Sequence, residues 1–530
     1  MTFFAFTRFQ PARRLSALAV AVLLALPGLS AAGHAAEPKL GPPEDFSFDI
    51  LSEKARALAA EPFKPHEPAH PELLDRIDYD AHWKIRFNED ATVFAGKTAP
   101  LQFFHLGRFF RAPVRMSLVA DGKAREILYS ADYFSMPDDS PAKAIENEAG
   151  FAGFRIMRDD LKTDWISFLG GAYFRTDGAE TQYGLSARGV AIDTGLAKPE
   201  EFPRFTEFYF SDGEVAGENA VIYALLDGPS VTGAYRIRAA NGDGQVLDVT
   251  ATLFFRNAVE RVGIAPLTSM FWYSEMNRAS AYDWRPEVHD SDGLAIETGT
   301  GERIWRPLNN PDRVVTSSFV DEDVKGFGLI QRDRAFANYQ DDGVFYNRRP
   351  SVWIEPVGEW GKGAVQLVEI PTNDEIFDNI VAYWNPERAP VVGEPMTFSY
   401  KLHWNRDEPY PGALARTVAS RTGRGGVPGQ PRPDDQVRIV IDFEGSPLAG
   451  LTQKDAVKAK VTASGGTVKR AYTLPIVGTK NAWRLTCDLE VPADAGTIDI
   501  RAFLSKDGKP LTETWLGQMH ASQVAKAARH

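Results

Sequence analysis

Two stretches of the sequence place aromatic side chains and carboxylates close together. Residues 349–384 contain four tryptophan and tyrosine residues and a dense set of acids: Trp353, Trp360, Tyr383, Trp384, Glu355, Glu359, Glu369, Asp374, Glu375 and Asp378. Residues 271–305 repeat the combination: Trp272, Tyr273, Tyr282, Trp284, Trp305, Glu287, Asp290 and Asp292. Aromatic rings stack on the apolar faces of sugars, and carboxyl groups move protons at a glycosidic bond. The pattern predicts two walls of one carbohydrate-active cleft.

The segment from Glu369 to Trp384 is the stronger candidate for catalysis. Pro371 removes a backbone donor and so ends a strand, and a new strand is predicted over residues 380–384. The residues between form a loop or lid, on which Glu375 and Asp378 would share one face if the loop takes a helical turn. A carboxyl there could act as a general acid if burial or a neighbouring acid raised its pKa. The alternative is that these acids only cap a turn.

The segment from Arg285 to Gly293 contains the sequence Asp-x-Asp-Gly, which is typical of calcium loops. Counted from Asp290, the twelfth position is Gly301, where such a loop needs glutamate, so calcium is disfavoured. His289 could orient Asp290. No pair of histidines has metal-ligand spacing, and no nucleotide-binding or Gly-x-Ser-x-Gly motif occurs, so we expect neither metal nor cofactor.

Five tryptophans are candidates for sugar contacts: Trp272, Trp284, Trp305, Trp353 and Trp360. For each of them, burial in the core of a β-sandwich is an equally good interpretation, because a large apolar ring serves either purpose.

The composition narrows the partners and the compartment. The chain has 530 residues and a formal net charge of −12, which disfavours nucleic acid. Residues 1–35 read as a secretory signal, because arginines precede an apolar run over residues 15–29 and small residues follow it. The single cysteine, Cys487, allows no intramolecular disulfide. These features predict an exported protein of the bacterial periplasm that does not span the membrane.

The elements that position the acids are predicted to be strands. An amphipathic helix is expected over residues 48–60, and from about Trp83 the hydrophobic period changes to two, with a hairpin turn at residues 241–244. We expect an all-β chain with an N-terminal β-sandwich over residues 40–404. A Gly- and Pro-rich linker over residues 405–435 and a small immunoglobulin-like sandwich over residues 436–518 would follow.

Several long strings resemble the periplasmic glucan biosynthesis family MdoG/OpgG, which includes the paralogue OpgD. They are RPSVWIEPVGEWGKGAVQLVEIPTNDEIFDNIVAYW, RPEVHDSDGL, FDILSEKARALAAEPF and FHLGRFFRAPVRM. The resemblance implies a galactose-mutarotase-type sandwich, a C-terminal immunoglobulin-like domain and a role in making osmoregulated periplasmic glucans with a β-1,2-linked backbone. The poor twin-arginine match of the signal favours the G member over the D member.

The resemblance also implies roles for particular residues. Family members are similar to anomer-inverting endo-β-1,2-glucanases, in which Asp378 would be the general acid and Asp290 the base, acting through a chain of waters. Tyr346 would relay protons or hold the substrate, and Glu375 would support the acid. Inversion typically needs about 6.5–9.5 Å between the two carboxyl groups.

Three functions are compatible with these residues. The first is an endo-β-1,2-glucanase that trims the polymer, and the second is a transglycosylase that branches or cyclises it. The third is a non-enzymatic binding module that guides β-1,2-glucan away from the inner-membrane glucosyltransferase and would not need Asp378 or Asp290. Flat sandwich faces are also compatible with a homodimer.

Overall fold

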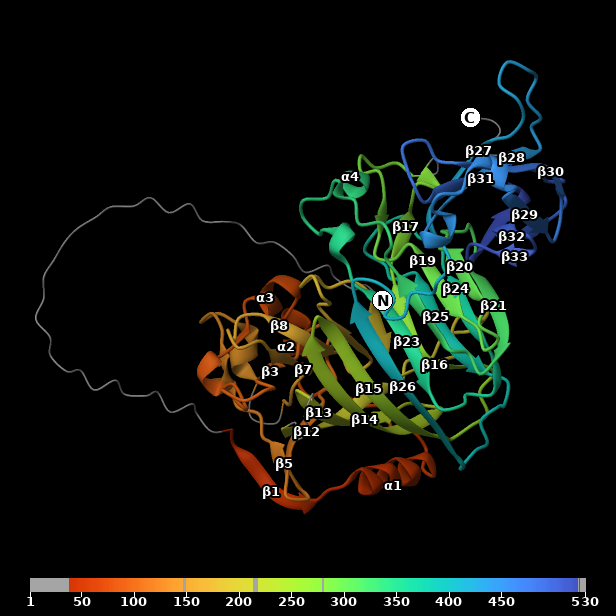
Figure 1. Ribbon diagram of the computed structural model, residues 1–530. Coiled ribbons are helices and arrows are strands. Elements are labelled where there is room, and N and C mark those ends of the chain that lie inside the picture. The colour runs from red at the N-terminus through yellow and green to blue at the C-terminus, as the bar shows by residue number, and fades with distance from the viewer. Residues whose placement is uncertain (1–37, 146–148, 213–217, 279–280, 523, 525–530) are drawn as a thin grey trace, which may run out of the picture.

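Strands dominate the computed structural model, which describes residues 38–145, 149–212, 218–278, 281–522 and 524 (Figure 1). This confirms the predicted all-β fold class. The signal peptide predicted over residues 1–35 lies outside the described residues. The helix expected over residues 48–60 is confirmed as α1, and Ser47 caps it by accepting a hydrogen bond of 3.1 Å from the N–H of Ile50. The α-helices of the described part are α1 (Phe48–Ala59), α2 (Pro71–Arg76), α3 (Tyr79–Trp83) and α4 (Phe336–Tyr339).

Within the described residues, a 16-stranded sheet runs through the whole molecule. One short strand, β33 (Lys509–Pro510), pairs only with β32 (Thr497–Lys506) and lies outside the linear order of the other strands. The other strands are, in spatial order, β1 (Leu40–Asp45), β5 (Lys123–Ile127), β4 (Arg115–Ala120), β12 (Arg204–Asp212), β13 (Ala220–Asp227), β14 (Val231–Gly242), β15 (Gly244–Phe255), β26 (Pro395–Asn405), β23 (Ser351–Val357), β22 (Gly326–Ile330), β19 (Gly293–Glu297), β20 (Arg303–Pro307), β34 (Thr514–His520), β32 (Thr497–Lys506) and β29 (Lys458–Ala463).

A 10-stranded sheet, again counted over the described residues, carries the segments on both sides of the predicted acidic loop. In it, β11 (Val190–Ile192) pairs with β16 beside the main path. The other strands are, in spatial order, β21 (Val315–Glu322), β24 (Lys362–Glu369), β25 (Ile380–Pro386), β16 (Val262–Ser269), β10 (Ser186–Arg188), β9 (Tyr173–Thr176), β8 (Asp164–Leu169), β7 (Gly153–Met157) and β3 (Leu101–Phe104).

The two large sheets pack face to face through phenylalanine side chains. Phe154 of β7 lies 4.9 Å from Phe208 and 4.7 Å from Phe210 of β12, measured between ring centroids, and both pairs meet edge to face. Phe168 of β8 meets Phe208 at 5.2 Å in the same way. All four rings are buried, and edge-to-face contacts add to the stabilisation that burial provides. The two sheets therefore form a large sandwich around one core.

The hairpin predicted at residues 241–244 joins β14 to β15, with Asn241 opposite Gln245. Its strands show the alternation that suggested it. Tyr235 and Ile237 are buried, whereas Arg236 between them is partly exposed. Hydrophobic side chains on one face of the strand thus fix its register against the core.

A second, small sandwich follows in the chain and is coloured blue in Figure 1. Its four-stranded sheet has the order β27 (Arg416–Arg424), β28 (Gln436–Glu444), β31 (Ala482–Glu490) and β30 (Thr467–Pro475). This sheet packs against β32 and β34, and Ile439, Phe443, Ile500 and Leu504 belong to their common core.

The linker expected over residues 405–435 needs correction, because it contains β27. This strand pairs in antiparallel register with β28, from Arg416 opposite Glu444 to Arg424 opposite Val437. The Gly- and Pro-rich composition misled because the inward-facing residues of β27, Thr417 and Ser420, are polar. The backbone N–H of Thr417 donates to Glu513, and the hydroxyl of Ser420 accepts from Trp515.

The two sandwiches share the large sheet. Strand β20 pairs in parallel with β34, with Ile304 opposite Thr514 and Trp305 opposite Trp515. The sheet thereby continues from the large sandwich into the small one. Among the described residues, no helix is long and apolar enough to cross a membrane.

Candidate active site

The segments that carry Asp290 and Asp378 are both hydrogen-bonded to the backbone of Met270 and Phe271. A two-stranded ladder of β17 (Phe271–Tyr273) and β18 (Val288–His289) ends at Asp290, whose N–H donates to the carbonyl of Met270 at 2.8 Å. Asn379, next to Asp378, accepts from the N–H of Phe271 at 2.8 Å and donates to its carbonyl at 2.9 Å. Two segments almost ninety positions apart in the sequence are thus fixed against Met270 and Phe271.

The environment of Asp378 favours its protonated form. The side chain is half-buried, at the end of the loop between β24 and β25. Burial, followed by the charge of Asp290, raises the pKa of Asp378 to about 6, although Arg175, Arg188 and Arg349 act in the opposite direction. The structure therefore brings the two predicted acids within electrostatic reach of each other.

Asp290 is buried beside Arg349. Its Oδ1 lies 3.4 Å from Nη1 of this arginine, and among the described residues it has no hydrogen-bond partner. Burial raises the pKa of Asp290, while the positive charges of Arg349, His289 and Arg175 lower it. A buried carboxyl oxygen without a partner can accept a hydrogen bond from a water or a sugar hydroxyl.

Glu375 and Tyr346 meet at a second ionic group, centred on Arg285. The hydroxyl of Tyr346 donates to Glu375, and the guanidinium of Arg285 binds both oxygens of Glu375 at 2.8 and 3.1 Å. Arg285 also donates to Asp341 at 2.8 Å and to Asp283. Tyr346 opens the short 3₁₀ turn over residues 346–348, and the guanidinium of Arg349 lies over its ring at 5.1 Å.

The predicted loop over residues 372–378 forms a turn between β24 and β25 without a helix. The strand ends at Glu369, as proline at position 371 suggested, and the next begins at Ile380. Asn310 ties this loop to the other segment by donating to the carbonyls of Trp272 at 3.0 Å and Thr372 at 2.8 Å.

The five predicted tryptophans separate into two groups. Trp284 is 68% exposed and Trp272 is partly exposed, so both rings are accessible on the segment that carries Asp290. Trp305, Trp353 and Trp360 are buried. Their rings pack inside the protein instead of being exposed for the sugar contacts expected from the sequence.

The buried indoles have identifiable partners. Trp305 lies under the guanidinium of Arg332 at 3.7 Å, and Trp360 donates its Nε1–H to the carbonyl of Ser399 at 3.2 Å. Trp353 packs so closely on Gly326 that a Cβ there would lie 2.3 Å from the ring. These contacts leave no ring face for a sugar.

Sequence reasoning missed the cations of the site. Arg285 and Arg349 each precede a proline in the motifs that drew attention to the acids, and that position was their only signal. Arg175 on β9 and Arg188 on β10 gave none, because an arginine in an alternating strand usually faces solvent. Here the fold brings their charges near enough to Asp378 to act against the rise of its pKa.

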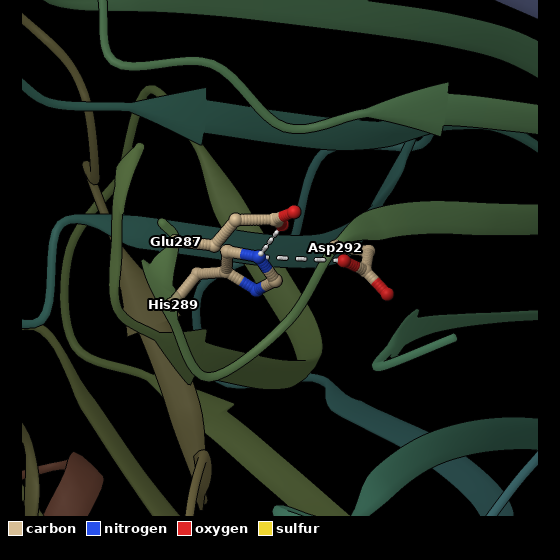
Figure 2. A group of neighbouring side chains, drawn as sticks. All are labelled: Glu287, His289 and Asp292. Atoms are coloured by element: carbon tan, nitrogen blue, oxygen red, sulfur yellow. Dashed lines mark hydrogen bonds and ion pairs between the residues drawn. The ribbon is translucent and has the colours of Figure 1, made fainter. Parts of the chain in front are cut away.

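Glu287, His289 and Asp292 form a compact group on the segment that carries Asp290 (Figure 2). Their potential ligand atoms all lie within 4.8 Å of one another, which is close enough to hold a metal ion. The same groups also form hydrogen-bonded ion pairs, since Nε2 of His289 lies 3.0 Å from Glu287 and 3.5 Å from Asp292. The other oxygen of Asp292 accepts from the backbone N–H of Asp333 at 2.7 Å, which gives the Asp-x-Asp-Gly sequence a structural use.

The fold and the site together define an all-β protein of two joined sandwiches, with a pair of interacting carboxyl groups and accessible aromatic rings on the segment that carries one of them. The chain belongs to the family "Periplasmic glucan biosynthesis protein, MdoG", whose family model matches residues 46–519.

Curated relatives extend over nearly the whole chain. "Glucans biosynthesis protein D 2" of Ralstonia nicotianae is 50% identical and covers 96% of this chain and 97% of its own length. "Glucans biosynthesis protein D" of Stenotrophomonas maltophilia is 48% identical, covering 95% of both chains, and that of Xanthomonas campestris is 46% identical, covering 95% and 96%. These relatives carry the D name, so they give no support to the preference for the G member.

A likeness to the collagen adhesin of S. aureus covers 52% of this chain and 87% of that chain. With a TM-score of 0.10 and 8% identity, it carries no argument about the fold.

Proposed function

We propose that this protein acts in the periplasm on the β-1,2-glucan backbone of osmoregulated periplasmic glucans, as an anomer-inverting endo-β-1,2-glucanase. The observation that carries the proposal is the pairing of Asp378 with Asp290, in which burial and, after it, the charge of Asp290 raise the pKa of Asp378 to about 6. Membership of the periplasmic glucan biosynthesis family supports the compartment and the polymer.

The environments of the two carboxyls suggest different roles. Burial and, after it, the charge of Asp290 let Asp378 keep its proton to a higher pH, so Asp378 acts as general acid and protonates the glycosidic oxygen. Asp290, beside Arg349, acts as general base and takes a proton from the attacking water through further waters. Attack from the face opposite to the leaving group inverts the anomeric carbon.

Tyr346 and Glu375 would hold the substrate at this site. The Tyr346 hydroxyl donates its hydrogen bond to Glu375, so its oxygen lone pairs are left to accept a hydrogen bond from a sugar hydroxyl. The bidentate pair of Glu375 with Arg285 fixes the orientation of that carboxylate. The exposed rings of Trp272 and Trp284 would stack on sugars on either side of the bond that breaks.

The first experiment is to incubate the purified protein with linear β-1,2-glucan and to separate the products by chromatography. Wild-type protein is expected to give shorter linear oligomers, and Asp378→Asn to give none. Asp374→Asn is the matched control, because it changes an acid of the same loop that lies four positions away. Its products should match those of the wild type.

Two other outcomes would contradict hydrolysis. Products that resist exo-glucosidases would indicate a cyclising or branching transglycosylase with the same site. A polymer that binds but stays intact would leave a non-enzymatic carrier, working beside the inner-membrane glucosyltransferase. Proton NMR of the first product formed would test inversion, since an α-anomer must appear first from a β-linkage.

A further inference from the structure

Glu287, His289 and Asp292 direct three ligand atoms at one small volume (Figure 2). Nε2 of His289 lies 3.0 Å from Oε2 of Glu287 and 3.5 Å from Oδ1 of Asp292. An ion with bonds of about 2.1 Å, as zinc forms to nitrogen and oxygen, separates tetrahedral ligand atoms by about 3.4 Å. Glu287 and His289 are buried, and the partial exposure of Asp292 gives an ion a way in.

Three consecutive residues after β22 hold two of these ligands in place. Nε2 of Gln331 donates to two backbone carbonyls, each at 3.1 Å, so its Oε1 is the atom that faces Nδ1 of His289, at 3.0 Å. The backbone N–H groups of residues 332 and 333 both donate to Oδ2 of Asp292. Such contacts are typical of metal ligands, whose remaining nitrogen or oxygen is oriented by an outer hydrogen bond.

The contact with Gln331 determines which nitrogen of His289 offers a lone pair. Oε1 of Gln331 can only accept, so Nδ1 carries a hydrogen and donates it. In the neutral ring the lone pair therefore lies on Nε2, which faces Glu287 and Asp292. Carboxylate oxygens are acceptors as well, so three acceptors face one another inside the protein with no hydrogen between them. A cation at their centre satisfies all three.

The negative charge of this group is only weakly opposed by the protein. Within the described residues, no lysine or arginine forms an ion pair with Glu287 or Asp292. Glu275 lies near enough to add its charge to theirs. Arg334 acts on Asp292 from beyond ion-pair distance, and its guanidinium donates to backbone carbonyls. One proton on the ring would supply a single positive charge, whereas a divalent ion supplies two and binds both carboxylates at once.

We propose that Glu287, His289 and Asp292 bind a divalent transition-metal ion, with Zn²⁺ as the best match, in a structural site on the segment that carries Asp290. Zinc accepts one imidazole nitrogen with two carboxylate oxygens, and a water completes its shell. Calcium and magnesium prefer oxygen ligands throughout, which disfavours them here. The sequence offers a single histidine at this place, so the spacing of histidine pairs gave no sign of the site.

The ion would close a short loop of backbone. His289 ends β18 and Asp292 precedes β19, so an ion bound to both clamps the two residues between them, Asp290 and Ser291. Because these ligands come together only in the folded chain, binding stabilises the folded state. The site does not depend on the function proposed above, since it rests on ligand atoms alone.

The first experiment measures the metal itself. Untagged protein is purified without chelators, and its metals are counted by inductively coupled plasma mass spectrometry, with about one zinc per chain expected. After removal of metals with EDTA and dialysis, Zn²⁺ should bind with a single-site isotherm in calorimetry. At a free concentration about 100-fold above Kd, it should raise the melting temperature by about 3 °C. Protein that carries no stoichiometric metal, and that Zn²⁺ neither binds nor stabilises, would overturn the proposal and leave a proton on His289 to pair the carboxylates.

Asp292→Asn and Glu287→Gln each remove one ligand charge and keep the shape of the side chain. We expect zinc affinity to fall by more than about 100-fold in both, and the stabilisation by Zn²⁺ to disappear. Glu355→Gln is the matched control, because Glu355 lies 2.7 Å from Nε2 of His403 in another histidine–carboxylate pair. The control should bind zinc as the wild type does. Equal binding by all three variants would place the ion elsewhere and overturn the proposal.

Gln331→Met removes an outer contact and keeps the three ligands. We expect zinc affinity to fall about 10- to 100-fold, less than in the ligand variants. X-ray absorption at the zinc edge, on wild-type protein with one equivalent of Zn²⁺, decides the matter if the variants fail to fold. A shell of nitrogen and oxygen at about 2.0–2.1 Å with one imidazole is expected. A shell with sulfur, or with more than one imidazole, would overturn the proposal.

Discussion

At the scale of single residues, surroundings decide what each carboxyl group can do. Asp378 and Glu375 lie three positions apart on one loop and face different partners. Asp378 is opposite the charge of Asp290, whereas Glu375 is bound on both oxygens by Arg285. The first environment favours a proton on the carboxyl, and the second favours a fixed carboxylate. In the proposed mechanism, one loop therefore supplies both the general acid and a support for the substrate.

The raised pKa of Asp378 predicts how activity depends on pH. A general acid must hold its proton, and Asp378 holds it below about pH 6 and loses it as the pH rises through this value. We expect kcat/KM on β-1,2-glucan to fall about tenfold for each further pH unit above this point. Initial rates between pH 4 and 9 provide the measurement. A rate that stays constant from pH 5 to 8 would contradict the assignment.

Trp284 and Trp360 offer a matched pair of substitutions. Trp284→Ala removes an exposed ring and should raise KM for the glucan by about 3- to 10-fold, with an unchanged melting temperature. Trp360→Ala removes a core ring and should lower the free energy of unfolding by about 3–5 kcal/mol. Steady-state kinetics and chemical denaturation measure the two effects. A stable Trp360→Ala protein with weakened glucan binding would restore the predicted sugar contact.

The proximity of the two acidic segments could be predicted from the sequence, whereas the burial of three of the tryptophans could not. An acid that follows a strand near aromatic residues suggests chemistry wherever it lies. A tryptophan has the same pattern of neighbours in a core and in a binding site. Trp353 is packed on Gly326, a residue of another strand, and only the pairing of β22 with β23 brings the two together.

At the scale of elements, the site depends on a short ladder and a loop that share one support. Asp290 directly follows β18 of the two-stranded ladder, and Asp378 lies at the end of the loop before β25. Asn379 is the residue that joins them, since its side chain binds both backbone groups of Phe271. The hydrogen bonds between the Asn379 side-chain amide and the backbone of Phe271 therefore help to set the distance between the two acids.

Asn379→Ala tests this support. The change leaves the backbone groups of Phe271 without their partner, which should cost about 1–3 kcal/mol of stability for each buried group left unpaired. We expect a lower kcat and a similar KM, because the acid moves and the sugar contacts stay. Asn373→Ala, on the exposed part of the same loop, is the control and should behave as the wild type. Equal kinetics of the two variants would contradict the role of Asn379.

Strand β27 shows where sequence patterns fail for elements. Its inward positions are Thr417 and Ser420 instead of the apolar residues that mark a strand. They belong inside because Glu513 accepts from the N–H of Thr417 at 2.7 Å and Trp515 donates to Ser420 at 2.9 Å. Partners almost a hundred positions away cannot be recognised from local alternation. The hairpin of β14 and β15, with apolar inward positions, was predictable.

At the scale of the whole molecule, a buried ionic network joins the two sandwiches. Arg332, after β22, binds Glu408 and Glu513, each at 2.6 Å, and lies over the ring of Trp305. The small sandwich also holds the segment after β17, since the N–H of Ser420 donates to Glu275 at 2.8 Å. The second sandwich therefore supports the segment that leads to Trp284 and Asp290.

Arg332→Met should destabilise both sandwiches together. It leaves the buried carboxylate of Glu513 without its cation, which typically costs about 3–5 kcal/mol, and removes one of the cations of Glu408, which keeps Arg303 at 3.1 Å. Because the sandwiches share a sheet, we expect one cooperative unfolding transition, moved to lower denaturant concentration. Guanidinium titrations followed by fluorescence and circular dichroism provide the measurement. Arg388→Met, which removes an exposed pair with Glu394, should change stability by less than about 1 kcal/mol. Two separate transitions in the wild type would contradict the coupling.

The parallel pairing of β20 with β34 has a consequence for solubility. Without the small sandwich, β20 would become an outer strand with open backbone donors and acceptors, and the indole of Trp305 would lose its cover. Such a rim recruits strands from other molecules and leads to aggregation. The small sandwich thus covers an edge strand through which molecules would otherwise self-associate. A shortened chain that ends before residue 416 would precipitate at concentrations where the full-length protein stays dispersed.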